Sequence, residues 1–155
     1  MLSSWGRGIA VSLALGACTT VANERVDDPA KELDETVFKC SVEPILARQC
    51  SYTACHGNAG TPLRVFTPGK LRAATPADID ASTAVLTDAE HHANFESAAA
   101  FAFGDVAAVD NLLLRKTTPP NAGGFAHAGG AIFTGTGDAQ YKAIADWLGH
   151  RGVCP

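Results

Sequence analysis

Apolar side chains recur at helical spacing in several stretches of the chain. Val42, Ile45 and Leu46 form the first of these patterns. Pro44 falls in its first turn, where a missing N–H costs no hydrogen bond. The pattern predicts a helix that begins near Val42 and runs directly into Cys50.

Two further helical patterns follow in the middle of the chain. Residues 86–103 have acidic side chains in their first turn and an apolar stripe on one face, formed by Phe95, Ala98, Ala99, Ala102 and Phe103. Gly104 is placed to end that helix. Residues 111–114 predict a short helical turn whose leucines are mostly buried.

The last helix is predicted to follow Asp138, which is typical of an N-cap, and to end before Gly149. Its buried face consists of Tyr141, Ile144, Ala145 and Leu148, with Trp147 beside that face. Residues 57–62 and 117–137 are rich in Gly, Pro, Thr and Asn and are predicted to be loops. The expected fold class is therefore mainly α, with few helices and long loops.

Length and charge narrow the classes of function. The chain has 155 residues and a formal net charge of -4, so it offers no basic footprint for nucleic acid. No nucleophile–base pair, phosphate loop or carboxylate pair stands at a telling spacing, and we therefore expect no enzyme activity. After an N-terminal segment, the remaining length suits one small domain.

That N-terminal segment predicts export. Met1 to Gly8 carry one positive charge, on Arg7, and an apolar run over residues 9–15 follows. Small residues then precede Cys18, which completes the pattern of a signal peptide over residues 1–17. The apolar run is too short to span a bilayer, which takes about 20 residues in a helix.

Leu15-Gly16-Ala17-Cys18 resembles the signal of bacterial lipoproteins, in which the cysteine is acylated and becomes the first residue after cleavage. The resemblance implies a lipid on Cys18, and Thr19 in place of an aspartate implies anchoring in the outer membrane, facing the periplasm. The alternative is an ordinary secretory signal, which leaves Cys18 as a free thiol. Residues 18–36 are polar and predict a flexible tether, followed by the folded domain over residues 37–155.

One short segment carries the chemistry: Cys50-Ser51-Tyr52-Thr53-Ala54-Cys55-His56-Gly57. Two cysteines followed directly by a histidine are the arrangement that fixes a c-type haem. Cys50 and Cys55 are then the candidates for the thioether bonds, and His56 is the candidate proximal ligand of the iron. The usual motif has two residues between the cysteines, whereas this chain has four. The alternative is that the same cysteines close a small disulfide loop.

Export makes disulfide bonds admissible for the other cysteines. With Cys18 assigned to lipid and Cys50 and Cys55 to haem, Cys40 and Cys154 remain as a natural pair. A bridge between them closes a loop of over a hundred residues, and such a loop corresponds to about 4 kcal/mol of stabilisation.

A second iron ligand must come from elsewhere in the chain. The only methionine is Met1, which leaves with the signal peptide, so the site is either bis-histidine or open or weakly held on its distal side. The candidate histidines are His91, His92, His127 and His150. His127 is favoured because glycines flank it and let the backbone approach a flat macrocycle. The others are interpreted as solvated surface histidines.

Several motifs occur in one order along the chain. They are Val42-Glu43-Pro44-Ile45-Leu46, Cys50…Cys55-His56-Gly57, Asn111-Leu112-Leu113-Leu114-Arg115-Lys116, His127-Ala128-Gly129-Gly130 and Tyr141…Trp147-Leu148. In this order they resemble the small cytochrome c-like domains of exported bacterial proteins. The resemblance covers about residues 37–154, and it implies a cytochrome c-like fold, haem on the Cys–Cys–His segment and His127 as a distal contact.

Two functions from different classes follow. The first is a lipid-anchored, monohaem c-type electron carrier with covalent haem c, which passes single electrons between redox proteins of the periplasm or envelope. The alternative is a haem-free lipoprotein that keeps the fold as an interaction module, with Cys50–Cys55 and Cys40–Cys154 bridges. A zinc site built from Cys50, Cys55, His56 and His127 is disfavoured, because export favours oxidised sulfur over free thiolate.

Overall fold

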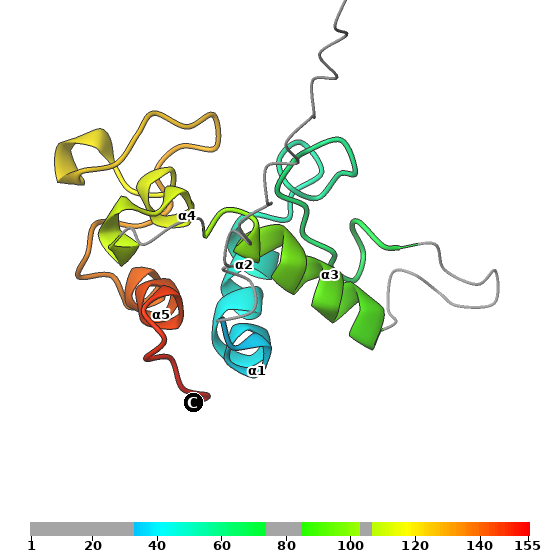
Figure 1. The fold of residues 1–155 in the computed structure, drawn as a ribbon. Helices are drawn as coiled ribbons and strands as arrows, with labels where there is room; N and C mark the ends of the chain where they lie inside the picture. Colours follow the sequence, from blue (N-terminus) through cyan, green and yellow to red (C-terminus); the bar gives the residue numbers. More distant parts are fainter. Residues whose placement is uncertain (1–32, 74–84, 103–106) are drawn as a thin grey trace, which may run out of the picture.

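The computed structural model describes residues 33–73, 85–102 and 107–155. The expected signal peptide, Cys18, most of the expected tether and the predicted helix stop at Gly104 lie outside the described residues. Helices and loops make up the described part, which holds no β-strand, so the prediction of a mainly α protein is confirmed (Figure 1). No helix in these residues is long and apolar enough to cross a membrane.

A continuous helical run opens the described chain. It comprises α1 (Glu35–Val37), a π-helical turn η2 (Phe38–Val42) and α2 (Glu43–Gln49). The run begins earlier than the expected start near Val42, because the Asp34 side chain caps α1 by accepting a 3.0 Å hydrogen bond from the backbone N–H of Val37.

The π-turn explains how Pro44 fits inside this run. Pro44 has no N–H to give to the preceding turn, which would interrupt an ordinary α-helix. The N–H of Glu43 donates instead to the Phe38 carbonyl, five residues back, and α2 then starts with Pro44 in its first turn. The first helix therefore extends through a proline that the sequence pattern had placed at its beginning.

The later helices occur where they were predicted, except that the helix predicted to reach residue 103 ends at Ala99, with Ala100 as its C-cap. Helix α3 (Asp88–Ala99) begins with a capping box, in which the Thr87 hydroxyl accepts from the N–H of Glu90 and the Glu90 carboxylate accepts from the N–H of Thr87. The short helix α4 (Leu112–Arg115) is capped by the Asn111 side chain.

Helix α5 (Ala139–Leu148) is capped by Asp138 as expected. The 3₁₀ turns η3 (Ala108–Asp110) and η4 (Pro120–Ala122) complete the described elements. Leu112 departs from the expectation of a mostly buried leucine run, since it is 41% exposed while Leu113 and Leu114 are buried.

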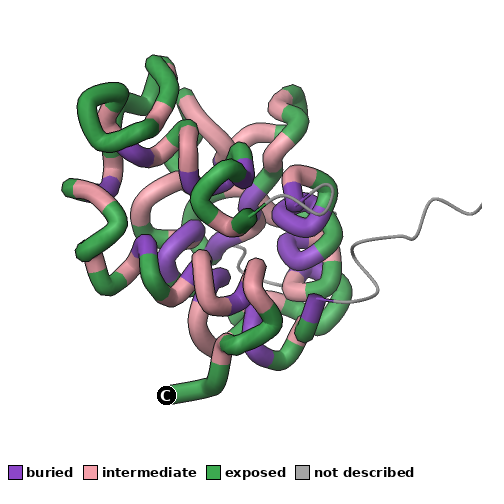
Figure 2. The backbone as a smooth tube through the Cα atoms, turned by 60° about the vertical axis from the view of Figure 1, so that its left-hand side comes forward, coloured by how far each residue is buried: buried purple, intermediate pink, exposed green. Residues whose placement is uncertain are grey.

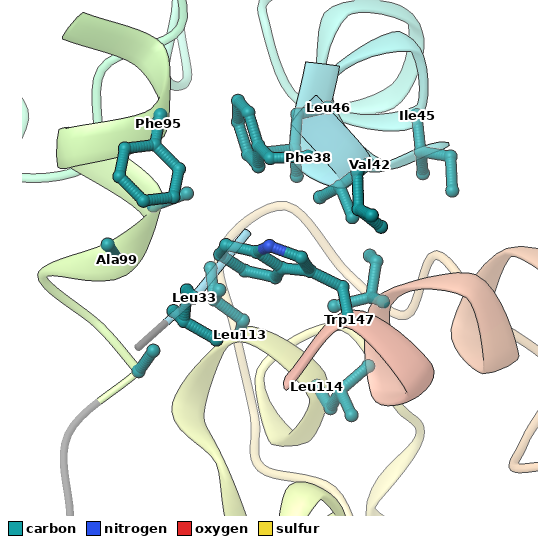
Figure 3. Close-up of a cluster of buried hydrophobic side chains, with 14 of the residues drawn as sticks. Leu33, Phe38, Val42, Ile45, Leu46, Phe95, Ala99, Leu113, Leu114 and Trp147 are labelled. Atoms are coloured by element: carbon teal, nitrogen blue, oxygen red, sulfur yellow. The ribbon is translucent and has the colours of Figure 1, made fainter. Parts of the chain in front are cut away.

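Trp147 occupies the centre of the core (Figure 3). Its ring centroid lies 5.3 Å from that of Phe38 and 6.3 Å from that of Phe95, and its Nε1–H donates to the Asp34 carbonyl at 3.0 Å. The sequence pattern had placed Trp147 beside the buried face of the last helix. In the structure the buried face of α5 consists of Trp147, Tyr141 and Ile144, whereas Ala145 and Leu148 are half-buried.

The terminal segments are also joined covalently. Cys40 and Cys154 form a disulfide with Cα atoms 5.5 Å apart, which confirms the predicted bridge. Beside it, the Ser41 hydroxyl donates to the Val153 carbonyl at 2.9 Å. The buried residues follow the facing sides of the helices, and the long loops that carry the candidate site are largely exposed (Figure 2).

Polar contacts fix the loop after α2 against α3. The side chain of Asn94 exchanges two hydrogen bonds with the backbone of Phe66, at 2.7 and 3.0 Å, and also donates to the buried Glu43 carboxylate at 2.7 Å. The Ser97 hydroxyl accepts from the backbone N–H of Arg64 at 2.7 Å. These bonds join three segments of chain and hold the backbone that follows the Cys–Cys–His segment.

Candidate cofactor site

A cavity of about 330 Å³ opens between α2, α4, α5 and the loops that follow α2 and α4. Most of its wall is apolar, with contributions from Leu46, Leu63, Phe101, Leu113, Ile132 and Phe133. Its volume lies in the range of pockets that take small organic cofactors, roughly 300–1,000 Å³. Cys50, Cys55, His56 and His127 all line it, so one cavity collects the four residues that the sequence singled out for haem attachment and ligation.

The segment between the two cysteines forms an exposed loop beside the cavity, with Tyr52 on the cavity wall. Cys50 ends α2 by donating its N–H to the Leu46 carbonyl at 2.8 Å, and its own carbonyl accepts from the N–H of His56 at 3.1 Å. The loop closed by this bond exposes residues 52–54, while Cys50, Cys55 and His56 stay half-buried at the cavity wall. Thr53 and Ala54 do not line the cavity, so the longer spacing leaves room for two residues on the exposed side of the loop.

Two contacts hold this loop in its tight form. A Cβ on residue 57 would lie 2.1 Å from the Ser51 carbonyl oxygen, so Gly57 is required for the two backbones to pass. The Lys70 ammonium donates to the Ser51 hydroxyl at 2.8 Å and stands 4.3 Å from the centroid of the Tyr52 ring. Lys70 thus links the tip of the loop to the following segment.

Cys50 and Cys55 carry free thiols. Burial, followed by the charge of the neighbouring Cys55, raises the pKa of Cys50 from 9.0 to about 11. Burial therefore disfavours the thiolate form of Cys50 in the free protein.

His56 is oriented by the backbone of its own loop. Its Nδ1 lies 2.9 Å from the carbonyl oxygen of Leu63, an acceptor, so Nδ1 must carry the proton. The lone pair is then on Nε2, which is the arrangement that metal-bound histidines use. The His56 carbonyl accepts from the N–H of Val65 at 2.8 Å, which fixes the residue from the other side.

His127 reaches the same cavity from the loop that follows α4. Its imidazole ring is parallel to that of His56 within 9°, and the two ring centroids are 6.0 Å apart. The backbone around it is a tight turn, in which the N–H of Gly130 donates to the His127 carbonyl at 2.8 Å. A Cβ on residue 129 would lie 2.9 Å from Cε1 of His127, so Gly129 leaves the room that this ring occupies.

The other three histidines do not line the cavity. His91 is half-buried and not solvated as expected, because it directs Nδ1 to the buried Glu43 carboxylate at 2.6 Å. His92 directs Nδ1 to the exposed Glu35 at 3.1 Å. His150 follows α5 with a backbone φ of 55° and is exposed. Of the candidate distal histidines, the structure therefore brings only His127 to His56.

The residues present fit a haem. A metal ion bonds imidazole nitrogen at about 2 Å, so two imidazoles on opposite sides of one ion have centroids roughly 6 Å apart. The centroids of His56 and His127 are separated by this distance, while their planes are stacked, so the agreement with a ligand pair is one of distance. The apolar wall suits a macrocycle, and both cysteines lie at it as thiols, the form from which thioethers are made.

A tetrahedral metal centre has no such support. Within the described ranges, no group of three or more His, Cys, Asp or Glu side chains is placed to hold a metal ion. The set of Cys50, Cys55, His56 and His127, which the sequence analysis weighed as a zinc site, is thus not assembled as one.

Sequence reasoning missed two residues of the site. The carbonyl of Leu63 orients His56, and a backbone acceptor leaves no signal in the sequence. Lys116 lines the cavity and directly follows the leucine run of α4, where its charge beside an apolar stretch was the available signal.

No protein-family model, no curated protein and no solved structure matches the chain.

Proposed function

We propose that the protein is a monohaem c-type electron carrier of the cell envelope with a cytochrome c-like fold. The observation that carries the proposal is the pair formed by His56 and His127, two parallel imidazoles 6.0 Å apart at an apolar cavity that two free cysteines also line. Neither a disulfide-stabilised module nor an ordinary surface loop needs this pairing.

Each residue has a distinct role in this proposal. Cys50 and Cys55 hold the haem through thioether bonds, and His56, with its Nδ1 proton on the Leu63 carbonyl, presents Nε2 as the proximal ligand. His127 is the distal ligand. A bound haem would supply the chemistry, which is the gain and loss of one electron.

The protein's own part is to hold two nitrogen ligands and to exclude water. Two histidine ligands leave no coordination position for a substrate, as suits a carrier rather than an enzyme. Bis-histidine ligation also sets the reduction potential below that of histidine–methionine carriers, because the axial ligands are a main determinant of that potential.

The decisive experiment measures covalent haem. The chain is produced with and without a haem-attachment system, and the intact mass and the pyridine haemochrome spectrum are recorded. We expect a mass increase of one haem that acid denaturation does not remove, and no haem on a Cys50→Ala/Cys55→Ala double variant. A Cys40→Ala/Cys154→Ala variant is the matched control and should keep the haem.

The opposite result has a defined meaning. A mass that corresponds to two disulfides and no haem would reject the carrier. It would favour the haem-free interaction module with a Cys50–Cys55 bridge.

We also propose that Cys18 is acylated and anchors the protein to the membrane, with redox proteins of the envelope as its partners. The support is the Leu15-Gly16-Ala17-Cys18 pattern alone. The mature protein should partition into detergent and incorporate labelled lipid, and Cys18→Ser should abolish both. Soluble protein with an unmodified N-terminus would contradict the anchor.

A further inference from the structure

The cavity contains one side chain with a fixed charge. Among the described residues that line it, Lys116 is the only lysine or arginine, and no aspartate or glutamate lines it. The remaining wall consists of apolar groups, the two cysteines, the two histidines and a few neutral polar side chains. A ligand that fills this cavity therefore meets a neutral, mainly apolar surface with a single cationic group.

The main chain holds Lys116 in place. It is the C-cap of α4, and its N–H donates to the Leu112 carbonyl at 3.1 Å. The next carbonyl, that of Thr117, accepts from the N–H groups of Ile132 and Phe133 at 2.8 and 3.0 Å. These bonds join α4 to the end of the loop that carries His127. The backbone of Lys116 is therefore held in place near the histidine pair.

The ammonium group of Lys116 has no ion-pair partner within the described residues. The residue is exposed although it lines the cavity, and its side chain therefore lies at the cavity mouth. An ion pair at a mouth costs little desolvation, whereas a carboxylate placed deep in an apolar wall without a partner is costly.

We propose that Lys116 binds the propionate carboxylates of the haem and so defines the end of the cavity where those carboxylates lie. The inference rests on the proposed function, since it takes haem to be the ligand of the cavity. Haem combines a large apolar ring with two carboxylates at one edge. That division matches a cavity with an apolar wall and one cation at its mouth. Lys116 acts on the iron only through this charge and is not a ligand.

The test uses the haem-loaded protein and its midpoint potential measured as a function of pH. A nearby cation favours the reduced iron, so Lys116→Gln should lower the potential. The same variant should raise the pKa of the haem carboxylates, because they lose the cation that keeps them ionised. The pH range over which the potential changes should therefore move to higher pH. Lys116→Arg should retain the wild-type potential and pH dependence.

Lys142→Gln is the matched control, since Lys142 is an exposed lysine on α5 that does not line the cavity. It removes the same charge and should shift neither quantity. Unchanged behaviour of Lys116→Gln, or an equal shift in Lys142→Gln, would overturn the inference while leaving covalent haem and the carrier function intact. A chain that carries no covalent haem by mass would overturn both.

A second measurement does not depend on thioether formation. The full chain made without attachment machinery is titrated with haemin and with its dimethyl ester, which lacks the carboxylates. An exposed ion pair contributes up to about 1 kcal/mol, so Lys116→Gln should weaken haemin binding by up to about fivefold and leave ester binding unchanged. Equal weakening for both compounds, or for neither, would count against Lys116 as the carboxylate partner.

Discussion

His56 and His127 face the same cavity with parallel rings, although one follows α2 and the other lies beyond α4. They are held differently. His56 has a 2.9 Å bond from Nδ1 to the Leu63 carbonyl, while Nδ1 of His127 is 3.5 Å from the carbonyl of Gly130. His56 is thus fixed by the fold, whereas the position of His127 depends on a glycine-rich turn.

The first prediction concerns His127. In haem-loaded protein, His127→Ala removes one of the two proposed nitrogen ligands, so the oxidised spectrum should change from low-spin to high-spin. The reduced form should bind carbon monoxide more tightly, and the thioether bonds should remain. Absorption spectra and intact mass measure these outcomes.

The remaining histidines provide the controls for this experiment. His91→Ala, His92→Ala and His150→Ala should keep the low-spin spectrum, because none of these residues lines the cavity. An unchanged low-spin spectrum in the His127 variant would show that another residue is the distal ligand.

The second prediction concerns Gly129. Its Cβ in Gly129→Ala would lie 2.9 Å from Cε1 of His127, so the imidazole must move. We expect a partial loss of the low-spin spectrum with a free energy of unfolding within about 0.5 kcal/mol of the wild type, since the site is on an exposed loop. Gly137→Ala is the control, because a Cβ there meets nothing within 4 Å. Identical spectra for both variants would contradict the proposed position of the His127 ring.

The third prediction concerns the Cys40–Cys154 bridge, which spans 114 residues of sequence. Replacing both cysteines by serine should lower the free energy of unfolding by about 4 kcal/mol, mainly because the unfolded chain gains freedom. Denaturant unfolding of the oxidised wild type and the double variant measures the difference. A loss below about 1 kcal/mol would mean that the bridge constrains the unfolded chain far less than its loop length predicts.

Local signals in the sequence predicted most of the helices. Asp138 caps α5, and acidic residues lie in the first turn of α3, as predicted. Both features depend on contacts between residues that are near neighbours in the sequence. The Cys40–Cys154 bridge was also predictable, because these two cysteines are the only pair left once Cys18 is assigned to lipid and the Cys–Cys–His motif to haem.

Residues whose environment depends on distant packing were harder to predict. Trp147 is buried because Phe38 and Phe95 approach it from two other helices, which a pattern within α5 does not report. Leu112 is exposed because a helix as short as α4 buries only one side. The first helix starts at Glu35, where Asp34 caps it, and continues to Pro44 through a π-turn that nothing in the local spacing indicates.

The residues of the site also divide into those that local sequence predicts and those that depend on distant parts of the chain. Cys50, Cys55 and His56 adjoin one another in sequence and were recognised together. His127 was selected from the glycines around it, and the structure places it at the cavity with His56.

The last prediction concerns the buried ion pair between Arg72 and Glu90. Both oxygens of Glu90 accept from the guanidinium at 2.8 Å, and backbone N–H groups of Ala73 and Thr87 donate to the same carboxylate at 2.9 Å. The Arg72 hydrogen bonds, and then those of the backbone, lower the pKa of Glu90 from 4.5 to about 2.

Because the folded-state pKa lies below the unfolded value, the contribution of Glu90 is complete above about pH 4.5 and is lost as the pH falls toward 2. Unfolding of the wild type near pH 3 should therefore take up about one proton more than unfolding of Glu90→Gln. Denaturant titrations between pH 7 and pH 2.5 give this number from the pH dependence of the unfolding free energy. Glu96→Gln, on the exposed face of the same helix, should behave like the wild type. If this control reduced the pH dependence of the unfolding free energy as much as Glu90→Gln does, the Arg72–Glu90 ion pair would not be the source of that dependence.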